Sequence, residues 1–353
     1  MSTSLHLVQL SGPSARRIAL VEEPRLRLLD GQSSIYALAQ QAIAQRISLS
    51  SLVRQSLSND LISYDAVYNG DSEWQLLPPI DVPGDPHRAI ISGTGLTHYG
   101  SARDRQNMHV NTITAQQAPT AEAVATAGPD SKMTDSMRMF EWGRQHGRPA
   151  EGAIGIAPEW FYKGSGSVLR AHNQSLEIPG YAEDGGEEAE IAAIYVTGPD
   201  GTPFRLGMCN GNEFSDHVFE RRNYLNLAGS KLRVCSIGPE LVLEAAFDDV
   251  PGTVRILRRG EPLWQKDIRT GESNMCHSLE NLEHHHFKFE DHRLPGQVHV
   301  HFMGADTLSF GEQVRLQPGD VMEVQFKGFG RALRNTISAQ QPLTAPVRVQ
   351  TLQ

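Results

Sequence analysis

Residues 185–196 read Gly-Gly-Glu-Glu-Ala-Glu-Ile-Ala-Ala-Ile-Tyr-Val, a glycine turn that leads directly into an apolar β-strand. Alternate side chains of a strand lie on one face, so Glu188 and Glu190 are expected to project together. Two adjacent carboxylates do not both stay ionised unless a cation or a proton offsets their charge. The pair is explained either by a solvated start of the strand or by two oxygen ligands for a divalent cation such as Mg²⁺.

A second acidic stretch, Leu-Gly-Met-Cys-Asn-Gly-Asn-Glu-Phe-Ser-Asp-His at 206–217, ends the next expected strand. An antiparallel return of this strand would bring Glu213 or Asp216 back beside the first pair. Three converging carboxylates are hard to explain as a solvated surface, which favours a cation site. Lys231 follows in Ala-Gly-Ser-Lys and could offset the negative charge of a substrate, although a single lysine in a loop is usually only solvated.

Composition limits the classes of protein to consider. The 353 residues include 32 Lys and Arg against 41 Asp and Glu, a net charge of −9, which argues against a general nucleic-acid binder. The three cysteines include no CxxC pair, and no apolar run approaches the roughly 20 residues of a membrane span. The N-terminus shows no secretion signal. We expect a cytoplasmic globular protein, and an enzyme.

The chain is expected to divide near residue 87. Residues 1–87 indicate a small mixed α/β domain, with short strands at 5–10 and 17–21 and a helical pattern over 33–57 that begins at Ser33 or Ser34. The Pro/Gly/Asp-rich segment 77–86 supplies the boundary.

Residues 88–353 change to short β-branched runs separated by glycine turns, which predicts a mainly β, rolled or barrel-like domain. The expected strands are 89–95, 188–196, 234–237, 241–246, 253–258, 298–303 and 321–326. The polar segment 112–152 has no strand pattern, contains a predicted helix at 134–146, and is typical of a lid.

The order Glu-x-Glu, then Asn-Glu-x-Ser, then Gly-x-Lys before an apolar-Gly-Pro strand resembles the fumarylacetoacetate hydrolase superfamily. Four further segments carry the same resemblance. They are Gly-Thr-Gly-Leu-Thr-His at 93–98, Pro-Glu-Trp-Phe-Tyr-Lys at 158–163, Leu-Gln-Pro-Gly-Asp-Val-Met-Glu-Val at 316–324 and Gly-Phe-Gly-Arg-Ala-Leu-Arg-Asn at 328–335. The resemblance extends over residues 88–335 and is strongest to the sugar-acid branch, the AraD1-like proteins and the 2-keto-3-deoxy-pentonate dehydratases.

The resemblance implies a role for individual residues. Glu188, Glu190 and Glu213 would be the ligands of Mg²⁺ or Mn²⁺, with Glu213 standing where the superfamily more often has Asp. The implied catalytic residues are Glu159, Lys231 and, as a further acid/base candidate, His98. The implied substrate-binding residues are Lys163, Thr307, Ser215 and Tyr224. The stretch 215–220, Ser-Asp-His-Val-Phe-Glu, departs from the Ser-Ala-Arg-Asp-x-Gln of the hydrolase branch, which weakens a transfer of hydrolase chemistry. The superfamily commonly forms dimers, so a homodimer or higher homo-oligomer is expected.

These roles predict a Mg²⁺-dependent dehydratase of a 2-keto-3-deoxy-pentonate, of the 2-dehydro-3-deoxy-D-arabinonate type, in non-phosphorylative pentose catabolism. A 2-keto acid chelates Mg²⁺ through its carboxylate and keto oxygens, which acidifies the C3 proton. Glu159 would take that proton, and loss of the C4 hydroxyl would give 2-ketoglutarate semialdehyde and water. Two alternatives are a C–C bond hydrolase of a 2,4-diketo acid and a non-catalytic sugar-acid binding protein.

Fourteen histidines offer further candidates. His98 and His109 follow the first strand of the β-rich part and are candidates for acid/base catalysis. The run at 284–286, with His277 and His292, has the residue type of a transition-metal site, but the acidic residues around it favour a charged, solvated loop. His299 and His301 alternate in a strand, and we expect them to face solvent.

Overall fold

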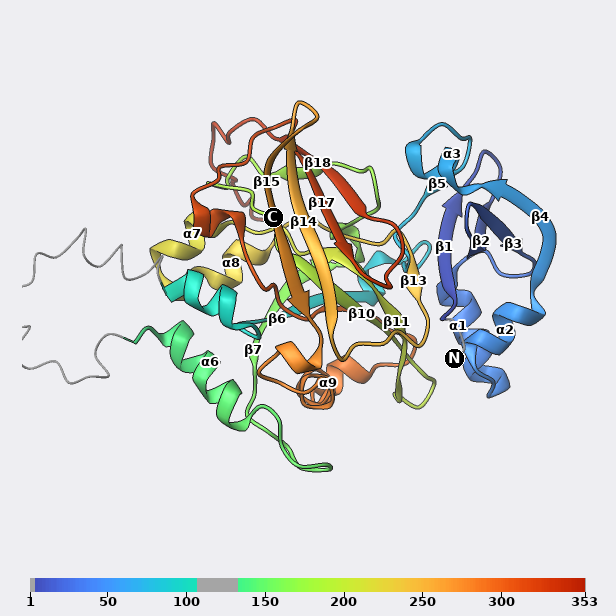
Figure 1. The fold of residues 1–353 in the computed structure, drawn as a ribbon, viewed down its shortest axis with the longest axis horizontal. Coiled ribbons are helices and arrows are strands. Elements are labelled where there is room, and N and C mark those ends of the chain that lie inside the picture. The colour runs from blue at the N-terminus through green and yellow to red at the C-terminus, as the bar shows by residue number, and fades with distance from the viewer. Residues whose placement is uncertain (1–3, 107–132, 353) are drawn as a thin grey trace, which may run out of the picture.

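The computed structural model describes residues 4–106 and 133–352, which form two β-sheets with helices around them (Figure 1). The fold is mainly β, as expected, although the sheets formed by the described strands are open and do not close into a barrel. The expected acid/base candidate His109 and most of the expected lid lie in 107–132, outside the described residues. No helix in the described part of the chain is long and apolar enough to cross a membrane.

The N-terminal residues form a β-meander with three helices, at the right of Figure 1. Its elements are β1 (His6–Ser11), β2 (Arg16–Glu22), β3 (Arg25–Leu29), α1 (Ile35–Gln45), α2 (Leu49–Gln55), β4 (Leu57–Ser63), α3 (Tyr64–Asn69) and β5 (Gln75–Leu76). Ser34 caps α1, as predicted, by accepting a hydrogen bond from the Ala37 amide. The single helix expected over 33–57 is two helices, because Arg46 ends α1 in a left-handed conformation and Ser48 caps α2.

The large sheet runs through both the N-terminal and the β-rich parts in the order β4-β3-β2-β1-β13-β11-β10-β16-β6-β7. Its remaining members are β6 (Ala89–Gly95), β7 (Glu159–Ser165), β8 (Leu169–Arg170), β10 (Ala189–Thr197), β11 (Pro203–Asn212), β12 (Cys235–Ile237), β13 (Leu241–Val242) and β16 (Val298–Phe302). Leu7 of β1 pairs with Leu241 of β13, which joins the N-terminal meander to the sheet. The domain division near residue 87 stays a prediction.

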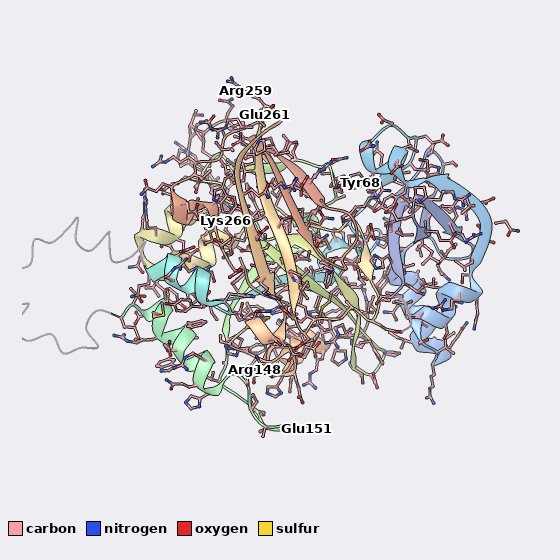
Figure 2. The ribbon with its side chains drawn as sticks, in the orientation of Figure 1. Tyr68, Arg148, Glu151, Arg259, Glu261 and Lys266 are labelled. Atoms are coloured by element: carbon pink, nitrogen blue, oxygen red, sulfur yellow. The ribbon has the colours of Figure 1, made fainter. Side chains whose placement is uncertain are left out.

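The second sheet has the order β15-β14-β17-β18-β9 and lies in front of β10 and β11 in Figure 1. Its strands are β9 (Leu176–Ile178), β14 (Val250–Arg258), β15 (Glu261–Thr270), β17 (Val321–Phe326) and β18 (Leu333–Ala339). The β14–β15 hairpin projects from the body, with Arg259 and Glu261 at its tip (Figure 2).

Strand β10 is buried along its whole length, which explains its unbroken apolar sequence. One face of the strand, including Ile191 and Tyr195, packs against the second sheet. The opposite face, including Ile194, packs in the same cluster as α1. The strand that begins with the acidic pair therefore lies at the centre of the molecule.

The helices of the β-rich part lie around the ends of the sheets. They include α6 (Asp135–His146), α7 (His217–Arg222), α8 (Leu227–Lys231) and α9 (Leu279–Phe287). Helix α6 confirms the helix predicted at 134–146, and Thr134 caps it. Arg148, labelled in Figure 2, hydrogen-bonds the Met275 carbonyl at 3.2 Å and so joins the segment after α6 to the segment before α9.

Two expectations about histidines are wrong. Residues 284–286 belong to α9 rather than to a solvated loop, and His285 and His286 are buried. His299 and His301 are also buried, with exposed fractions of 0% and 2%, rather than facing solvent. The reason is that β16 lies between two strands, β10 and β6. His286 of α9 also packs against the face of β16 that carries His299 and His301.

A buried carboxylate joins the N-terminal meander to the rest of the protein. Glu240 accepts hydrogen bonds from the Tyr64 hydroxyl at 2.7 Å and the Arg331 amide at 3.0 Å, and it lies 2.7 Å from His6 Nδ1. The Arg331 guanidinium also stacks on the Tyr64 ring, 3.9 Å from its centroid. Tyr68, beside this junction in Figure 2, donates to the Ala332 carbonyl at 2.8 Å.

We predict that Glu240→Ala destabilises the whole chain, because it removes the acceptor of the buried Tyr64 hydroxyl and the Arg331 amide. The expected loss in the free energy of unfolding is about 2–4 kcal/mol. Chemical denaturation monitored by circular dichroism measures it. Glu244→Ala, a change at an exposed carboxylate four residues away, is the control and should cost less than about 0.5 kcal/mol. Equal effects of the two changes would contradict the role given to Glu240.

Candidate metal centre and active site

The β10–β11 hairpin brings three carboxylates together. Glu188 directly precedes β10, Glu190 is its second residue, and Glu213 directly follows β11. The Glu213 amide donates to the Glu188 carbonyl at 2.9 Å, which closes the hairpin ladder at the point where the acids lie. One carboxylate oxygen from each residue lies within 4.8 Å of the other two. All three side chains are buried, with at most 3% exposed, so a solvated strand start does not describe them.

Two buried lysines lie against the carboxylates. Lys231, the last residue of α8, donates to Glu188 Oε1 at 2.5 Å and also contacts Glu213. Lys163, from β7, pairs with Glu213 and donates to the Phe214 carbonyl at 2.8 Å. The expected site residues Lys231 and Lys163 are thus in direct contact with two of the three acids, Glu188 and Glu213.

The surroundings of Glu188 and Glu190 shift the pKa values of these two carboxylates in opposite directions. Burial would raise the pKa of Glu188, but Lys231 and His217 beside it hold that pKa well below its usual range. Burial, together with the charges of Glu188 and Glu213, raises the pKa of Glu190 well above its usual range. Without a cation, Glu190 is therefore expected to hold a proton.

The donor set fits a hard divalent cation. When all three are ionised, the carboxylates carry more negative charge than Lys163 and Lys231 neutralise, and an oxygen-only set is the one that Mg²⁺ and Mn²⁺ prefer. The remaining Glu190 oxygen is oriented by the Gly304 amide, which donates to Oε2 at 2.6 Å. Glu188, Glu190 and Glu213 are thus the residues that would hold the ion.

A fourth carboxylate, Glu159, lies in the same region without belonging to the three. The side chains of Glu159, Phe161 and Lys163 are buried on one face of β7, and Lys231 Nζ lies 4.7 Å from the Phe161 ring centroid. Gly95 pairs with Glu159 across β6 and β7, and a Cβ at this glycine would lie 1.9 Å from Glu159 Oε1. The glycine therefore leaves the space that the Glu159 carboxylate fills.

Arg105 and Tyr224 hold the Glu159 carboxylate from two sides. Arg105 donates to Oε1 at 2.8 Å, and the Tyr224 hydroxyl donates to Oε2 at 2.9 Å. Burial raises the pKa of Glu159, and the Arg105 charge opposes that rise. Burial and the Glu159 charge both raise the pKa of Tyr224, so its hydroxyl keeps its proton and acts as a donor.

Sequence reasoning missed Arg105, which links several of these acids. The residue is 3% exposed and also lies 3.3 Å from Glu220 Oε1 and 4.0 Å from Glu188 Oε2. It belongs to a helical stretch at 99–106, just after β6. Its place soon after the expected first strand of the β-rich part was the only available signal.

His217 and Glu220 were also missed, although the stretch 215–220 stood out as a departure from the hydrolase pattern. His217 Nε2 lies 3.1 Å from Glu188 Oε1. Its Nδ1 is buried and has no hydrogen-bond partner in the described part of the chain. The Glu220 carboxylate likewise makes no hydrogen bond with any described residue, although it faces Arg105.

The other expected site residues fall in two places. The Ser215 hydroxyl donates to both oxygens of Glu213, at 3.1 and 2.9 Å, so it orients one of the three acids. His98 hydrogen-bonds the Thr97 and Thr270 hydroxyls, and burial lowers its pKa to about 4. Thr307 lines a polar pocket together with His98. The structure does not bring His98 and Thr307 into hydrogen-bond contact with the carboxylates that it describes.

No family model matches the sequence, and no curated protein matches it. Solved structures do match over 95% of this chain. The apo form of 2-keto-3-deoxy-D-arabinonate dehydratase aligns at a TM-score of 0.65 with 16% identity, over 99% of its own length. A structure of that enzyme complexed with magnesium and 2,5-dioxopentanoate aligns at 0.64 with the same identity and coverage.

An isomerase aligns as well. 2-Hydroxyhepta-2,4-diene-1,7-dioate isomerase from Mycobacterium marinum aligns at a TM-score of 0.57 with 13% identity, over 96% of this chain and 99% of its own. The chain therefore has the fold that this isomerase and the dehydratase share. The fold that the sequence resemblance implies is therefore confirmed.

We predict that Mg²⁺ binds more tightly as the pH rises. The pKa of Glu190 is raised well above its usual range, so the ion must displace a proton, and the affinity gains up to about tenfold per pH unit until Glu190 ionises. Isothermal titration calorimetry in buffers of different ionisation enthalpy measures both the affinity and the proton released. Glu190→Gln should remove the proton release. A pH-independent affinity in the unmodified chain would contradict the prediction.

Proposed function

We propose that this protein is a Mg²⁺-dependent dehydratase that converts a 2-keto-3-deoxy-pentonate, of the 2-dehydro-3-deoxy-D-arabinonate type, into 2-ketoglutarate semialdehyde and water. The observation that carries the proposal is that three convergent carboxylates lie in the same buried region as a separate carboxyl group, that of Glu159. The magnesium complex of the similarly folded dehydratase supports it, because 2,5-dioxopentanoate is the same compound as the semialdehyde product.

The ion and the basic side chains would hold the oxo-acid end of the substrate. Mg²⁺ held by Glu188, Glu190 and Glu213 would supply charge stabilisation at the keto oxygen, which makes the C3 proton easier to remove. Lys163 and Lys231 are buried against the same acids, so they offer ammonium groups to the substrate carboxylate. Ser215 keeps Glu213 in its orientation.

Glu159 would move the proton. Its raised pKa, which results from burial, suits a carboxylate that accepts a proton from carbon near neutral pH. Arg105 and Tyr224 fix both carboxylate oxygens, so the base cannot rotate away from the substrate. The protonated Glu159 can then return its proton to the departing C4 hydroxyl, which leaves as water.

The second candidate is a hydrolase that cleaves the C–C bond of a 2,4-diketo acid. The observation that favours it is His217, which lies 3.1 Å from Glu188 through Nε2 and whose buried Nδ1 has no partner among the described residues, so that Nδ1 could hold a water. Both reactions would use the same ion and lysines. In the dehydratase a substrate carbon loses a proton, whereas in the hydrolase a substrate carbon is attacked by water. A non-catalytic sugar-acid binding protein would need neither Glu159 nor His217.

The wider setting is also part of the proposal. We assign the reaction to non-phosphorylative pentose catabolism in the cytoplasm, carried out by a homodimer or higher homo-oligomer. A small-molecule substrate fits the buried, highly charged site.

We predict that the purified chain with Mg²⁺ releases the semialdehyde from 2-keto-3-deoxy-D-arabinonate. Reduction of a nicotinamide cofactor in a coupled aldehyde dehydrogenase assay measures the product. A chelator should abolish the release, and Mg²⁺ or Mn²⁺ should restore it. Release of pyruvate from a 2,4-diketo acid, with no semialdehyde from the sugar acid, would replace the dehydratase proposal with the hydrolase.

We further predict that Glu159→Gln lowers kcat by roughly 10²–10⁴-fold, because it removes the base but keeps the side-chain shape. Mg²⁺ affinity should be nearly unchanged, since Glu159 is not one of the three expected ligands. Tyr224→Phe is a milder change at the same site, because it keeps the Glu159 carboxylate and removes only its hydrogen bond from the Tyr224 hydroxyl. It removes one donor to the ionised carboxylate, so the pKa of Glu159 rises and the acidic limb of the pH–rate profile moves to higher pH. Full activity of Glu159→Gln would contradict this role.

A further inference from the structure

Four histidine rings meet on the far side of β7 and β16, away from the acidic site. His286 comes from α9, His292 from the short 3-10 helix Glu290–Arg293, and His299 and His301 from β16. One ring nitrogen from each of His286, His292 and His299 lies within 4.8 Å of the other two. His286 and His299 are at most 1% exposed, and His292 is half-buried.

The cluster has no acidic partner in the described part of the chain, so nothing nearby stabilises a positive charge on the buried rings of His286, His299 and His301. Burial, followed by the neighbouring rings, lowers the pKa of His286 well below its usual range. The same causes lower the pKa values of His299 and His301 to about 3. Uncharged imidazoles keep the lone pairs with which histidine binds metal ions.

The hydrogen bonds of the cluster fix its tautomers. His292 Nδ1 donates to the His286 carbonyl at 2.6 Å, which leaves Nε2 as the nitrogen with the lone pair. The Trp160 indole can only donate, and it does so to His286 Nδ1 at 3.2 Å. The proton of His286 is therefore on Nε2, which lies 2.9 Å from His299 Nδ1.

This chain of donors ends in an unsatisfied group. His299 accepts at Nδ1, so its own proton is on Nε2, which is buried and has no hydrogen-bond partner among residues 4–106 and 133–352. His299 therefore already presents the lone pair of Nδ1, the nitrogen that faces His286.

We propose that His286, His292 and His299 bind one transition-metal ion of the Zn²⁺ class, at a second site independent of the acidic centre. Three imidazoles without carboxylates or thiolates suit Zn²⁺ rather than Mg²⁺. Two nitrogens on a tetrahedral Zn²⁺ lie about 3.3 Å apart when the bonds are 2.0–2.1 Å long, so the 2.9 Å between His286 and His299 needs only a small opening. Water would fill the fourth position.

Binding requires one proton to move. His286 must offer the Nε2 lone pair to the ion, so its proton transfers to Nδ1, where it meets the Trp160 N–H. The indole must then turn away from His286. Trp160 is therefore both an obstacle to binding and a reporter of it.

The two sites lie on opposite faces of one strand. Glu159, Phe161 and Lys163 are buried on the acidic side of β7. Trp160, between the first two, points to the histidines, with its ring centroid 5.6 Å from that of His292. The sites differ in ligand type and can be loaded separately.

The test uses the full-length chain without a histidine tag, stripped of metal and titrated with Co²⁺ and then Zn²⁺. The double variant Glu188→Gln/Glu190→Gln serves as the starting protein, so that the acidic site does not compete. We expect one equivalent of Co²⁺, with the visible d–d bands of nitrogen-ligated tetrahedral cobalt, and its displacement by Zn²⁺. No bands, or bands of oxygen-only octahedral cobalt, would overturn the proposal.

Three variants locate the ion. His292→Gln, at the half-buried ligand, should weaken Zn²⁺ binding by more than the roughly 10–100-fold typical of losing only an outer partner. His284→Gln, at the exposed histidine of α9, the helix that carries His286, should leave the affinity unchanged. Trp160→Phe removes the competing N–H and should bind Zn²⁺ at least as tightly as the starting protein.

The same variants give a fluorescence readout that needs no enzyme activity. Co²⁺ should quench the tryptophan emission of the starting protein, and Trp160→Phe should lose most of that quenching while still binding the ion. Native affinity in His292→Gln, or an equal loss in His284→Gln, would overturn the assignment of the ligands. Circular dichroism confirms that each variant is folded.

Discussion

The centre of this molecule depends on holding three carboxylates together away from water. The antiparallel pairing of β10 with β11 places Glu188, Glu190 and Glu213 side by side, and the pairing itself supplies no charge to offset their repulsion. Lys163 and Lys231 supply positive charge from β7 and α8, and Glu190 can keep a proton. The surrounding elements thus supply charges that compensate the acids, and a divalent ion would replace part of this compensation.

Local patterns were enough to predict much of the fold. The strand at Ala89–Gly95 and the helix at Asp135–His146 agree with their patterns, because alternation and capping residues act over a few positions. The convergence of a third acid, Glu213 or Asp216, on the first pair was also predicted from sequence, since a hairpin brings chain neighbours together. The choice of Glu213 came from the family resemblance, and the structure brings Glu213 to the pair. A break such as the one at Arg46, where a helix ends on a left-handed residue, has no comparable signal in the residue types.

Contacts between distant segments could not be predicted in this way. Arg105 reaches Glu159 and Glu220 across more than fifty residues of chain, and no spacing rule connects them. His299 and His301 looked solvated because alternation shows that two side chains share a face but not what covers that face. In the fold, α9 brings His286 against them, and burial changes their chemistry.

Strand β10 is covered by α1 on one side and by the second sheet on the other. The N-terminal part, through α1, is consequently part of the cover of the central strand rather than an appendage to a self-sufficient barrel. A shortened chain that keeps only the β-rich part would lose the α1 side chains that pack in one cluster with Ile194 and Val196. This architecture therefore tolerates additions at hairpin tips more readily than removal of its first eighty residues.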